Sequence, residues 1–449
     1  MYFAKKHRWL LVVGCIIFIL ALMSGLGCAQ RKVKIFMRPE AWMRTMWKNI
    51  SSAYMEEHPD VNIKMEFAPD WTTKLKTLLA ARKAPDIFIM DDEIYPSFVV
   101  TGRLMDLTEK MKRDLNLEDY FPQALAAYNW FGKYYAIPME GAAVIIHYNK
   151  DLLKEAGLPY PTNSLYGKPD YTWETYLEAC KKLTKDTDGD GKIDQYGTSI
   201  RQWWPDWQAW MWAAGGAFYN KEMTECTLDS PESIKGFQFM CDLILKYKVT
   251  PSPAVQREEA TAALPGGLNL FRNGKLGFFI YGPWALKQLV KQEDLDFDFC
   301  LMPEGPAGSW CRNTWGSIAI NADAKDPELA WDIVKTACQP EFQRIIAEGF
   351  DLPPRRSVAY SEYFAFNPNT SFHEYVFITA LENYSRLTQI TLRYPEASQI
   401  IAAQMEKILL GDIKPTEALK EIAPKLEKLL APEDKGRWNF YYEKILKIQ

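Results

Sequence analysis

Two groups of side chains in this sequence are suited to holding a ligand rich in hydroxyl groups. The first is a crowd of tryptophans within ten positions: Trp203, Trp204, Trp207, Trp210 and Trp212. The second is a set of carboxylates, with Asp91, Asp92 and Glu93 directly after the apolar run 87–90 and Glu140 further along. Aromatic rings cover C–H faces of a ligand, while carboxylates and guanidiniums bind hydroxyls in fixed directions. The combination predicts a site for a sugar-like ligand.

Part of the tryptophan group has a simpler interpretation. On a helix, Trp203, Trp207 and Trp210 fall on one stripe, which would be buried in the core. The 16 Trp and 23 Tyr of the chain nevertheless exceed what a core needs, because a buried indole N–H or phenol O–H must find a partner. We therefore expect Trp204 and Trp207 to be among the ligand contacts.

Other candidates stand alone in the chain. Trp71 and Trp315 are predicted to add aromatic faces to the site. Among the carboxylates, Asp91, Asp92 and Glu140 are predicted ligand contacts, although solvated or helix-capping roles stay open for them. Arg355, which follows two prolines, could donate paired hydrogen bonds to hydroxyls or to a uronate, or could simply cover the surface.

The segment 186–194 reads D-x-D-x-D-G-x-I-x, which corresponds to the first nine positions of an EF-hand loop. Oxygen ligands from Asp186, Asp188, Asp190 and Asp194, with the backbone carbonyl of Lys192, would suit a hard cation. The twelfth position is Gly197 instead of a bidentate Glu. Because close carboxylates repel one another without a cation, we expect a structural Ca²⁺ here.

Catalytic motifs are weak by comparison. Three histidines follow the leader, His58, His147 and His373, and none has the neighbours that nucleophilic or zinc chemistry requires. No glycine-rich phosphate loop is visible. A pair of carboxylates about 5–9.5 Å apart could still make a glycoside-processing enzyme, and this alternative stays open.

The first residues predict export. Lys5, Lys6 and Arg8 precede an uncharged run over 9–27, which is typical of a secretory signal. The run stops at Cys28, and the segment 24–28 resembles the lipobox of bacterial lipoproteins, which implies a signal peptide over 1–27 and a lipid on Cys28. An uncleaved anchor is the alternative. We expect a lipid-anchored protein on the outer face of the cell membrane.

Charge and length narrow the class further. The formal net charge is −4, and removal of residues 1–27 takes it to −7, because three basic residues and no acidic one are lost. Without clustered Lys and Arg, a nucleic-acid partner is excluded. A mature chain of about 420 residues predicts two domains. The six cysteines after Cys28 show no metal-finger spacing; they are buried thiols or disulfides.

The elements that must position the site residues follow a regular order. Strands are predicted over 33–37, 61–67 and 87–90, separated by helices over 41–57 and 71–82. The last strand is a continuous apolar run, as expected of a strand buried on both faces. Alternating strands and helices indicate a doubly wound α/β sheet, which binds ligands beyond the carboxyl ends of its strands.

Several segments together resemble the family 1 extracellular solute-binding proteins, which are similar to maltose-binding protein. The matching segments, in chain order, are 57–61, 84–88, 102–108, 135–138, 148–153, 214–218, 271–275, 282–284, 302–306 and 327–331. The resemblance implies the type II periplasmic-binding-protein fold, an α/β fold with two discontinuous lobes, a hinge, and a ligand cleft between the lobes. It places lobe segments at 28–140 and 303–355 for the N-lobe and at 141–302 and 356–449 for the C-lobe, the last mainly helical. The expected hinge crossings are 138–143, 300–305 and 352–356.

The same resemblance implies function. The family binds sugars without turnover and passes them to an ABC importer, so the expected partners are a mono- or oligosaccharide and permease subunits, with the protein itself a monomer. Trp284 matches the family's Gly-Pro-Trp, where the ring stacks on ligand, and Gly216 belongs to the matching segment 214–218. The family also places polar sugar contacts after the segment 85–88. A sugar sensor or adhesin would keep this site and change only the downstream partner.

Overall fold

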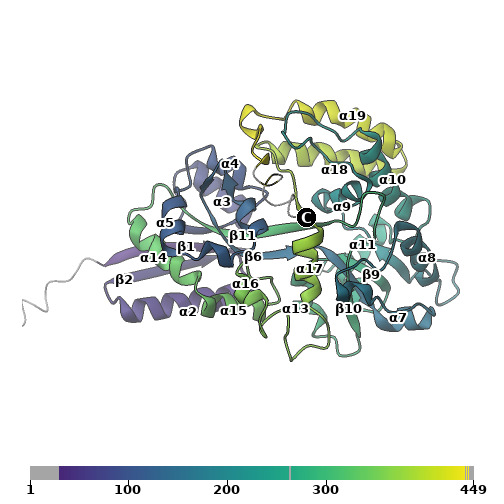
Figure 1. The fold of residues 1–449 in the computed structure, drawn as a ribbon, viewed down its shortest axis with the longest axis horizontal. Helices are drawn as coiled ribbons and strands as arrows, with labels where there is room; N and C mark the ends of the chain where they lie inside the picture. Colours follow the sequence, from purple (N-terminus) through teal and green to yellow (C-terminus); the bar gives the residue numbers. More distant parts are fainter. Residues whose placement is uncertain (1–29, 262–263, 440, 442, 444–449) are drawn as a thin grey trace, which may run out of the picture.

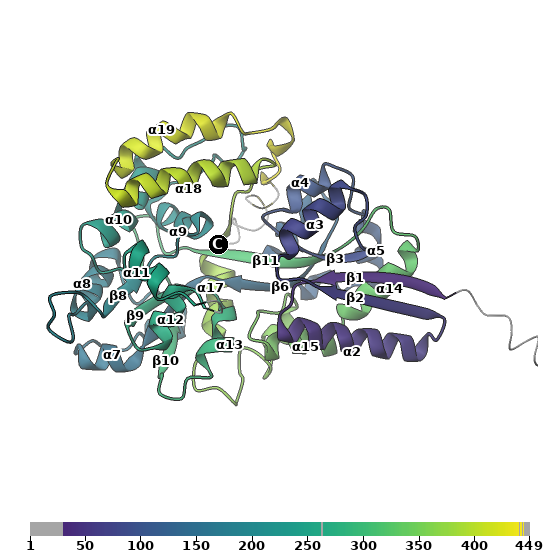
Figure 2. The same cartoon turned by 180° about the vertical axis from the view of Figure 1, so that it is seen from behind.

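The computed structural model describes residues 30–261, 264–439, 441 and 443. Two lobes lie side by side, each built on its own β-sheet with helices around it (Figures 1 and 2). The predicted signal peptide 1–27 and Cys28 lie outside the described residues. Within the described part, no helix is both long and apolar enough to cross a bilayer.

The sheet of the first lobe has six strands. Its order is β12, β11, β3, β1, β2, and β6 pairs with β11. β1 runs parallel to β2 and β3, whereas β11 is antiparallel to β3 and β6. The bounds are β1 Arg31–Met37, β2 Val61–Phe67, β3 Ile87–Asp91, β6 Ile137–Ala143, β11 Cys311–Ile320 and β12 Ser385–Leu387. The apolar run of β3 is buried, as predicted for a strand covered on both faces.

Helices cover this first sheet because each carries an apolar stripe. The helix α2 buries Trp42, Met46, Ile50 and Tyr54, which have the predicted helical spacing, and it ends at the predicted His58. The helices of this lobe are α2 Ala41–Glu57, α3 Trp71–Ala80, α4 Tyr95–Val99, α5 Thr108–Asp114, α6 Pro122–Ala127, α14 Pro327–Ala337, α15 Pro340–Glu348 and α16 Arg356–Ala359. A short hairpin, β4 Asn129–Trp130 and β5 Lys133–Tyr134, completes the lobe.

The second lobe has a four-stranded sheet in the order β10, β7, β9, β8. Its strands are β7 Ile145–Asn149, β8 Tyr196–Ser199, β9 Leu276–Tyr281 and β10 Phe297–Cys300. The α-helices are α7 Lys150–Glu155, α8 Trp173–Leu183, α9 Trp204–Ala214, α10 Pro231–Leu245, α11 Pro253–Glu258, α12 Gly266–Arg272, α13 Leu286–Leu289, α17 Tyr375–Tyr384, α18 Tyr394–Leu410 and α19 Pro415–Glu427. Helices α18 and α19 lie against α9 and α10 at one end of the lobe (Figure 2).

The links between the lobes lie next to one another. β6 ends at Ala143, and β7 of the other sheet begins two residues later. β11 pairs with β6 along its length. The segment after α15 joins them, because Gly141 and Leu352 exchange two backbone hydrogen bonds, at 2.8 and 3.0 Å.

The crossing expected at 300–305 is wrong. The segment after β10 stays on the second lobe, where Glu304 N–H donates to Tyr171 O at 2.8 Å and Ala307 N–H donates to Ala213 O at 2.8 Å. The chain changes lobe about ten residues later, along β11. The extended Pro/Gly segment that suggested a hinge is instead a loop pinned to α8 and α9. The first-lobe segment predicted to start at residue 303 therefore starts at Cys311.

Candidate ligand-binding site

The lobes enclose a cavity of about 630 Å³ between them. On the first lobe, Arg38 follows β1, Trp71 opens the helix after β2, and Asp91 ends β3. On the second lobe, Trp203 follows β8 and Trp284 follows β9. The carboxyl ends of parallel strands from both sheets thus face one cleft, which is where α/β sheets place ligands.

Half of the predicted ligand contacts meet in this cavity. They are Trp71, Asp91, Glu140, Trp284 and Trp315. Trp315 is only 1% exposed, so its ring belongs to the floor of the cavity and offers little open surface to a ligand. Its indole N–H donates to Asn313 Oδ1 at 3.0 Å, which fixes the ring in β11.

The other predicted contacts do not line this cavity, and backbone or side-chain partners explain two of them. The Asp92 carboxylate turns into the protein, where it accepts hydrogen bonds from the Thr314 hydroxyl and the Trp315 N–H, both at 3.2 Å. Arg355 donates from Nε to Asp119 Oδ2 at 2.7 Å, so it joins the segment before α16 to the segment before α6. Both side chains are structural.

Trp204, Trp207 and Gly216 also lie outside the cavity, because α9 buries the rings of Trp204, Trp207, Trp210 and Trp212. The Trp207 indole donates to Arg201 O at 2.8 Å. At Gly216, a Cβ would lie 2.4 Å from the backbone N of Ser233, so the glycine permits helix packing. The buried stripe predicted for Trp203 is wrong: this residue precedes the helix, is half-buried, and lines the cavity.

Arg38 organises the acidic wall of the first lobe. Its guanidinium pairs with Glu140, lies 3.2 Å from Asp91 Oδ1, and lies 3.6 Å from Glu40 Oε1. Its Cζ is also 5.7 Å from the ring centroid of Trp71. One arginine thereby holds three carboxylates and one indole in fixed positions, as its planar fork favours.

Arg312 makes a second cluster that connects the lobes. From β11 it donates from Nε to Asp206 Oδ1 of α9 at 2.7 Å, and its Nη1 lies 3.2 Å from Glu93 Oε1, just after β3. Its side chain is 3% exposed. Arg201 lies 3.3 Å from the other oxygen of Asp206. A buried guanidinium thus binds one carboxylate from each lobe beside the cavity.

The carboxyl groups after β3 are hard to ionise. Burial raises the pKa of Glu93 to about 8, with the nearby Asp92 adding to the effect and Arg312 opposing it. Burial also raises the pKa of Asp92 to about 6, again against the attraction of Arg312. Near neutral pH a protonated form of Glu93 is therefore accessible beside the ionised form that pairs with Arg312, and this form can donate a hydrogen bond as well as accept one on the cavity wall.

This pKa predicts a pH-dependent stability. Between the ordinary glutamate value of 4.5 and about 8, the folded protein binds a proton at Glu93 that the unfolded chain has lost. The free energy of unfolding should therefore fall as pH rises through this window, by up to about 1.4 kcal/mol between pH 6 and 7. Urea denaturation of Glu93→Gln should show a flatter dependence, because the amide does not titrate.

The charged groups around Glu93 are Asp91, Asp92, Arg201 and Arg312, and all stay in the variant. The exposed Glu341→Gln serves as a control and should keep the wild-type pH dependence. If Glu93→Gln showed the same slope as the wild type, the raised pKa of Glu93 would be refuted.

Two glycines make room for the aromatic rings. A Cβ on Gly282 would lie 2.1 Å from the ring of Trp284, and a Cβ on Gly141 would lie 2.3 Å from the ring of Trp315. Each indole thus occupies the space that a side chain at the glycine position would need. Trp284 also contacts Tyr281 edge-on, with ring centroids 5.3 Å apart, so its orientation is set from two sides.

Several cavity residues were not predicted. They include Arg38, Glu40, Lys76, Arg201, Lys287, Arg312, Asp351 and Tyr394, while Trp203 and Glu93 belong to the two candidate groups but were not among the predicted contacts. Arg38 and Glu40 follow a predicted strand directly, so the rule on strand carboxyl ends could have found them. The positions of Arg312 and Asp351 depend on contacts between distant segments and carry no local signal.

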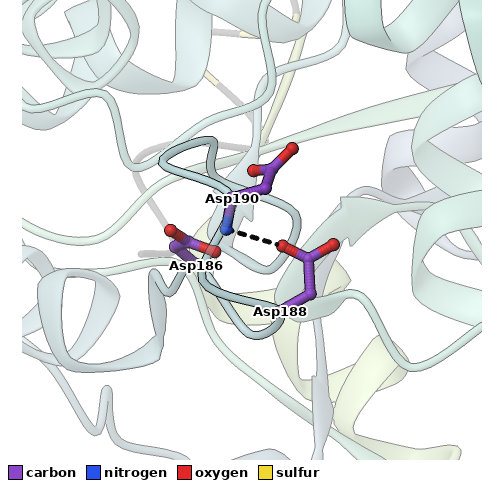
Figure 3. A group of neighbouring side chains, drawn as sticks. All are labelled: Asp186, Asp188 and Asp190. Atoms are coloured by element: carbon purple, nitrogen blue, oxygen red, sulfur yellow. Dashed lines mark hydrogen bonds between the residues drawn. The ribbon is translucent and has the colours of Figure 1, made fainter.

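The acidic loop predicted to bind calcium lies away from the cleft, on the surface. Carboxylate oxygens of Asp186, Asp188 and Asp190 lie within 4.8 Å of one another (Figure 3). Asp186 accepts from the N–H groups of Gly189 and Gly191, at 2.7 and 2.8 Å. The Asp194 carboxylate is outside this group. It accepts instead from the N–H and hydroxyl of Thr187, at 3.0 and 2.6 Å.

All six cysteines of the described chain are free and buried: Cys180, Cys226, Cys241, Cys300, Cys311 and Cys338. Of the two alternatives, the buried thiols are therefore what the structure contains, and the inter-lobe geometry depends on packing and hydrogen bonds instead of disulfides.

The fold and the cleft define a two-lobed binding protein. The chain belongs to the family of bacterial extracellular solute-binding proteins, whose sequence profile matches residues 39–344. This confirms the family recognised from the scattered segments, and it makes this an exported class of protein.

Individual relatives agree with this membership. A maltotriose-binding protein of Pyrococcus abyssi is 26% identical over 317 residues, which cover 69% of this chain and 62% of that protein. A putative binding protein of Brucella abortus is 25% identical over 444 residues, with 95% and 99% coverage. An ABC substrate-binding protein from Listeria monocytogenes, solved with cycloalternan, has a TM-score of 0.76 at 23% identity and covers 89% of this chain and 98% of that chain. The structural likeness confirms the predicted type II periplasmic-binding-protein fold.

Proposed function

We propose that the protein captures a carbohydrate in the cleft and delivers it to an ABC importer in the membrane. The observation that carries this proposal is the pairing of Trp71 from the first lobe and Trp284 from the second on the walls of one polar cavity. Rings on both lobes suit the C–H faces of a sugar, and the ion clusters between them suit its hydroxyls. The sugar named for the Pyrococcus relative and the cycloalternan of the Listeria structure support the same ligand class.

The charges of the cavity favour an uncharged sugar. Five basic side chains line it: Arg38, Lys76, Arg201, Lys287 and Arg312. Five acidic ones face them: Glu40, Asp91, Glu93, Glu140 and Asp351. Four of the five cations already bind carboxylates of the protein, including Lys287, whose Nζ lies 2.5 Å from Asp351 Oδ2. At these four cations a uronate or phosphate would have to displace a carboxylate of the protein, which leaves Lys76 as the remaining cation of the lining.

Some polar atoms remain for the ligand. Among the described residues, Glu40 Oε2 and Arg38 Nε are buried without a hydrogen-bond partner. Buried polar atoms are rarely left so, and both residues line the cavity. A sugar hydroxyl, which donates and accepts, can satisfy both.

Ligand binding would shift the equilibrium between an open and a closed arrangement of the two lobes. A ligand that contacts both walls stabilises the closed form by the difference between its affinities for the closed and open forms. β6, β11 and the segment at Leu352 are the links that would flex. A micromolar dissociation constant for the sugar would correspond to a binding free energy of about 8 kcal/mol.

A thermal-shift screen of neutral mono- and oligosaccharides, with charged homologues beside them, tests the proposal. At least one neutral sugar should raise the melting temperature, and its uronate homologue should do so less. A panel with no shift, confirmed by calorimetry without heat, would contradict the proposal.

Glycoside processing is the second candidate. Glu93, whose protonated form is accessible near neutral pH, and Asp91 resemble the acid and the carboxylate that such chemistry needs. Against this role, Glu93 is engaged by Arg312. Thin-layer analysis of oligosaccharides incubated with the protein separates the two: unchanged sugars support binding alone, and released products would favour the enzyme. A sensor or adhesin would bind sugar without supporting uptake by cells.

Attachment to the membrane through Cys28 is part of the proposal. The lipobox-like segment that ends in Cys28 supports it. Cells given radiolabelled fatty acid should label the protein, and Cys28→Ser should abolish the label and release the protein from membranes. If the wild-type protein were not labelled, lipidation would be contradicted and the alternative, an uncleaved signal anchor, would be favoured.

The acidic loop would hold a structural Ca²⁺ through Asp186, Asp188 and Asp190, whose hard oxygen donors suit this ion. With free calcium about five times Kd, the folded state would gain about 1 kcal/mol, and chelator should lower the melting temperature. Asp188→Asn should weaken this response, because it removes one negative charge from the site, while its amide oxygen can still accept from the N–H of Asp190, as Asp188 does at 3.0 Å. If neither calcium nor chelator changed the melting temperature of the wild type, the proposed calcium binding would be refuted.

A further inference from the structure

A second cavity lies beside the cleft on the second lobe. It has a volume of about 590 Å³ and is formed by the start of α9, by α11 and by α18. Helices α9 and α18 are neighbours in both views of the ribbon (Figures 1 and 2). We call it the α18 groove. Its size is within the range of small-molecule sites, about 300–1,000 Å³.

The α18 groove adjoins the ligand cleft at aromatic side chains. Trp203 lines both cavities. Tyr394, on the cleft wall, lies 5.6 Å by ring centroids from Trp204, which lines the groove. The two cavities are therefore neighbours that share the Trp203 side chain.

The groove, like the cleft, combines apolar side chains with charged ones. Trp203, Leu409 and the exposed Leu410 supply apolar surface, while Arg257 and Glu406 are exposed polar groups along it. Arg257 comes from α11 and Glu406 from α18. Their opposite charges allow hydrogen bonds to a neutral ligand without giving the groove a net charge. An apolar floor with polar edges matches a sugar ring, which has a C–H face and a hydroxyl rim.

We infer that the ligand is an oligosaccharide whose chain extends from the cleft across Trp203 into the α18 groove. This inference rests on the proposed function and specifies the length of its substrate: units in the cleft supply the common affinity, and units in the groove add to it. A mono- or disaccharide fills only the cleft, and longer homologues of the same sugar bind more tightly until the groove is filled.

Two alanines of α18 allow a matched test. Ala402 and Ala403 are both exposed, and only Ala402 lines the groove. Isoleucine at position 402 fills the groove without offering a flat ring or a hydrogen bond. The ligand series is the set of homologues, from two to seven units, of whichever neutral oligosaccharide gives the largest thermal shift with the wild type, titrated by calorimetry.

In the wild type and in Ala403→Ile, affinity should rise with chain length by on the order of tenfold. In Ala402→Ile, the shortest homologue should bind as in the wild type, and the rise should be lost. Equal affinities along the series in the wild type, or a rise that survives in Ala402→Ile, would overturn the inference while the sugar-binding function stands. Absence of binding by every glycan would instead defeat the function itself.

A second variant keeps the test independent of the folding of Ala402→Ile. Arg257→Ala/Glu406→Ala removes only exposed side chains of the groove, so its melting temperature should match the wild type. It should reduce the gain for long homologues several-fold and leave the shortest homologue unaffected. Wild-type affinities across the whole series in this double variant would count against the groove.

Discussion

Arg312→Met is expected to destabilise the protein by about 3–5 kcal/mol, the cost of removing one partner from a buried ion pair. Arg312 is 3% exposed at its side chain, and it is bound to Asp206 and Glu93, which come from different lobes. Methionine keeps much of the volume and none of the charge. The variant leaves Asp206 with Arg201 alone and leaves Glu93 beside Asp92 without a compensating cation.

Urea denaturation monitored by tryptophan fluorescence measures this loss. Arg312→Lys is the matched control: it keeps the positive charge, but it cannot donate two hydrogen bonds from a planar fork, so an intermediate loss is expected. Arg31, whose ion pair with Asp326 is exposed, provides a second comparison. Arg31→Met should cost at most about 1 kcal/mol. If Arg312→Met were as mild as Arg31→Met, the cluster would not hold the lobes together.

Trp284→Ala is expected to weaken sugar binding by about 1–3 kcal/mol, because a stacked ring at the centre of a site contributes affinity of this order. Trp284 lines the cavity, and Gly282 and Tyr281 fix its orientation. Calorimetry with the best sugar from the thermal-shift screen measures the loss.

Trp310→Ala is the control for this substitution. Trp310 is half-buried outside the cavity, with the guanidinium carbon of Arg386 3.8 Å from its ring centroid, so its loss should leave the affinity unchanged. Gly282→Ala, whose Cβ would meet the Trp284 ring, should weaken binding as well. Wild-type affinity in Trp284→Ala would remove this ring from the ligand site.

The sequence predicted the first lobe well because its elements are coded locally. The alternation of β2, the apolar run of β3 and the stripe of α2 each follow from a period of two or 3.6 residues. The hinge at 300–305 was placed wrongly for the opposite reason. Whether a Pro/Gly segment crosses between lobes depends on contacts such as that of Glu304 with Tyr171, which join residues far apart in the chain.

The site shows the same division. Trp71, Asp91 and Trp284 follow strands or open helices, so their place at the rim of a sheet could be predicted. Trp204 and Trp207 could not be separated from Trp203 by spacing alone, because the start of α9 decides which ring faces the cleft. The role of Arg312 could not be predicted, because its partners Glu93 and Asp206 belong to different lobes and only the folded chain brings them to β11.

A crystal structure of the protein with the neutral oligosaccharide that stabilises it most tests the proposed sugar site most directly. We expect electron density for the sugar between the lobes, with one ring packed on Trp284 and hydroxyls near Arg38 and Glu40. Density found only elsewhere on the surface, with the cleft holding solvent alone, would contradict the proposed site.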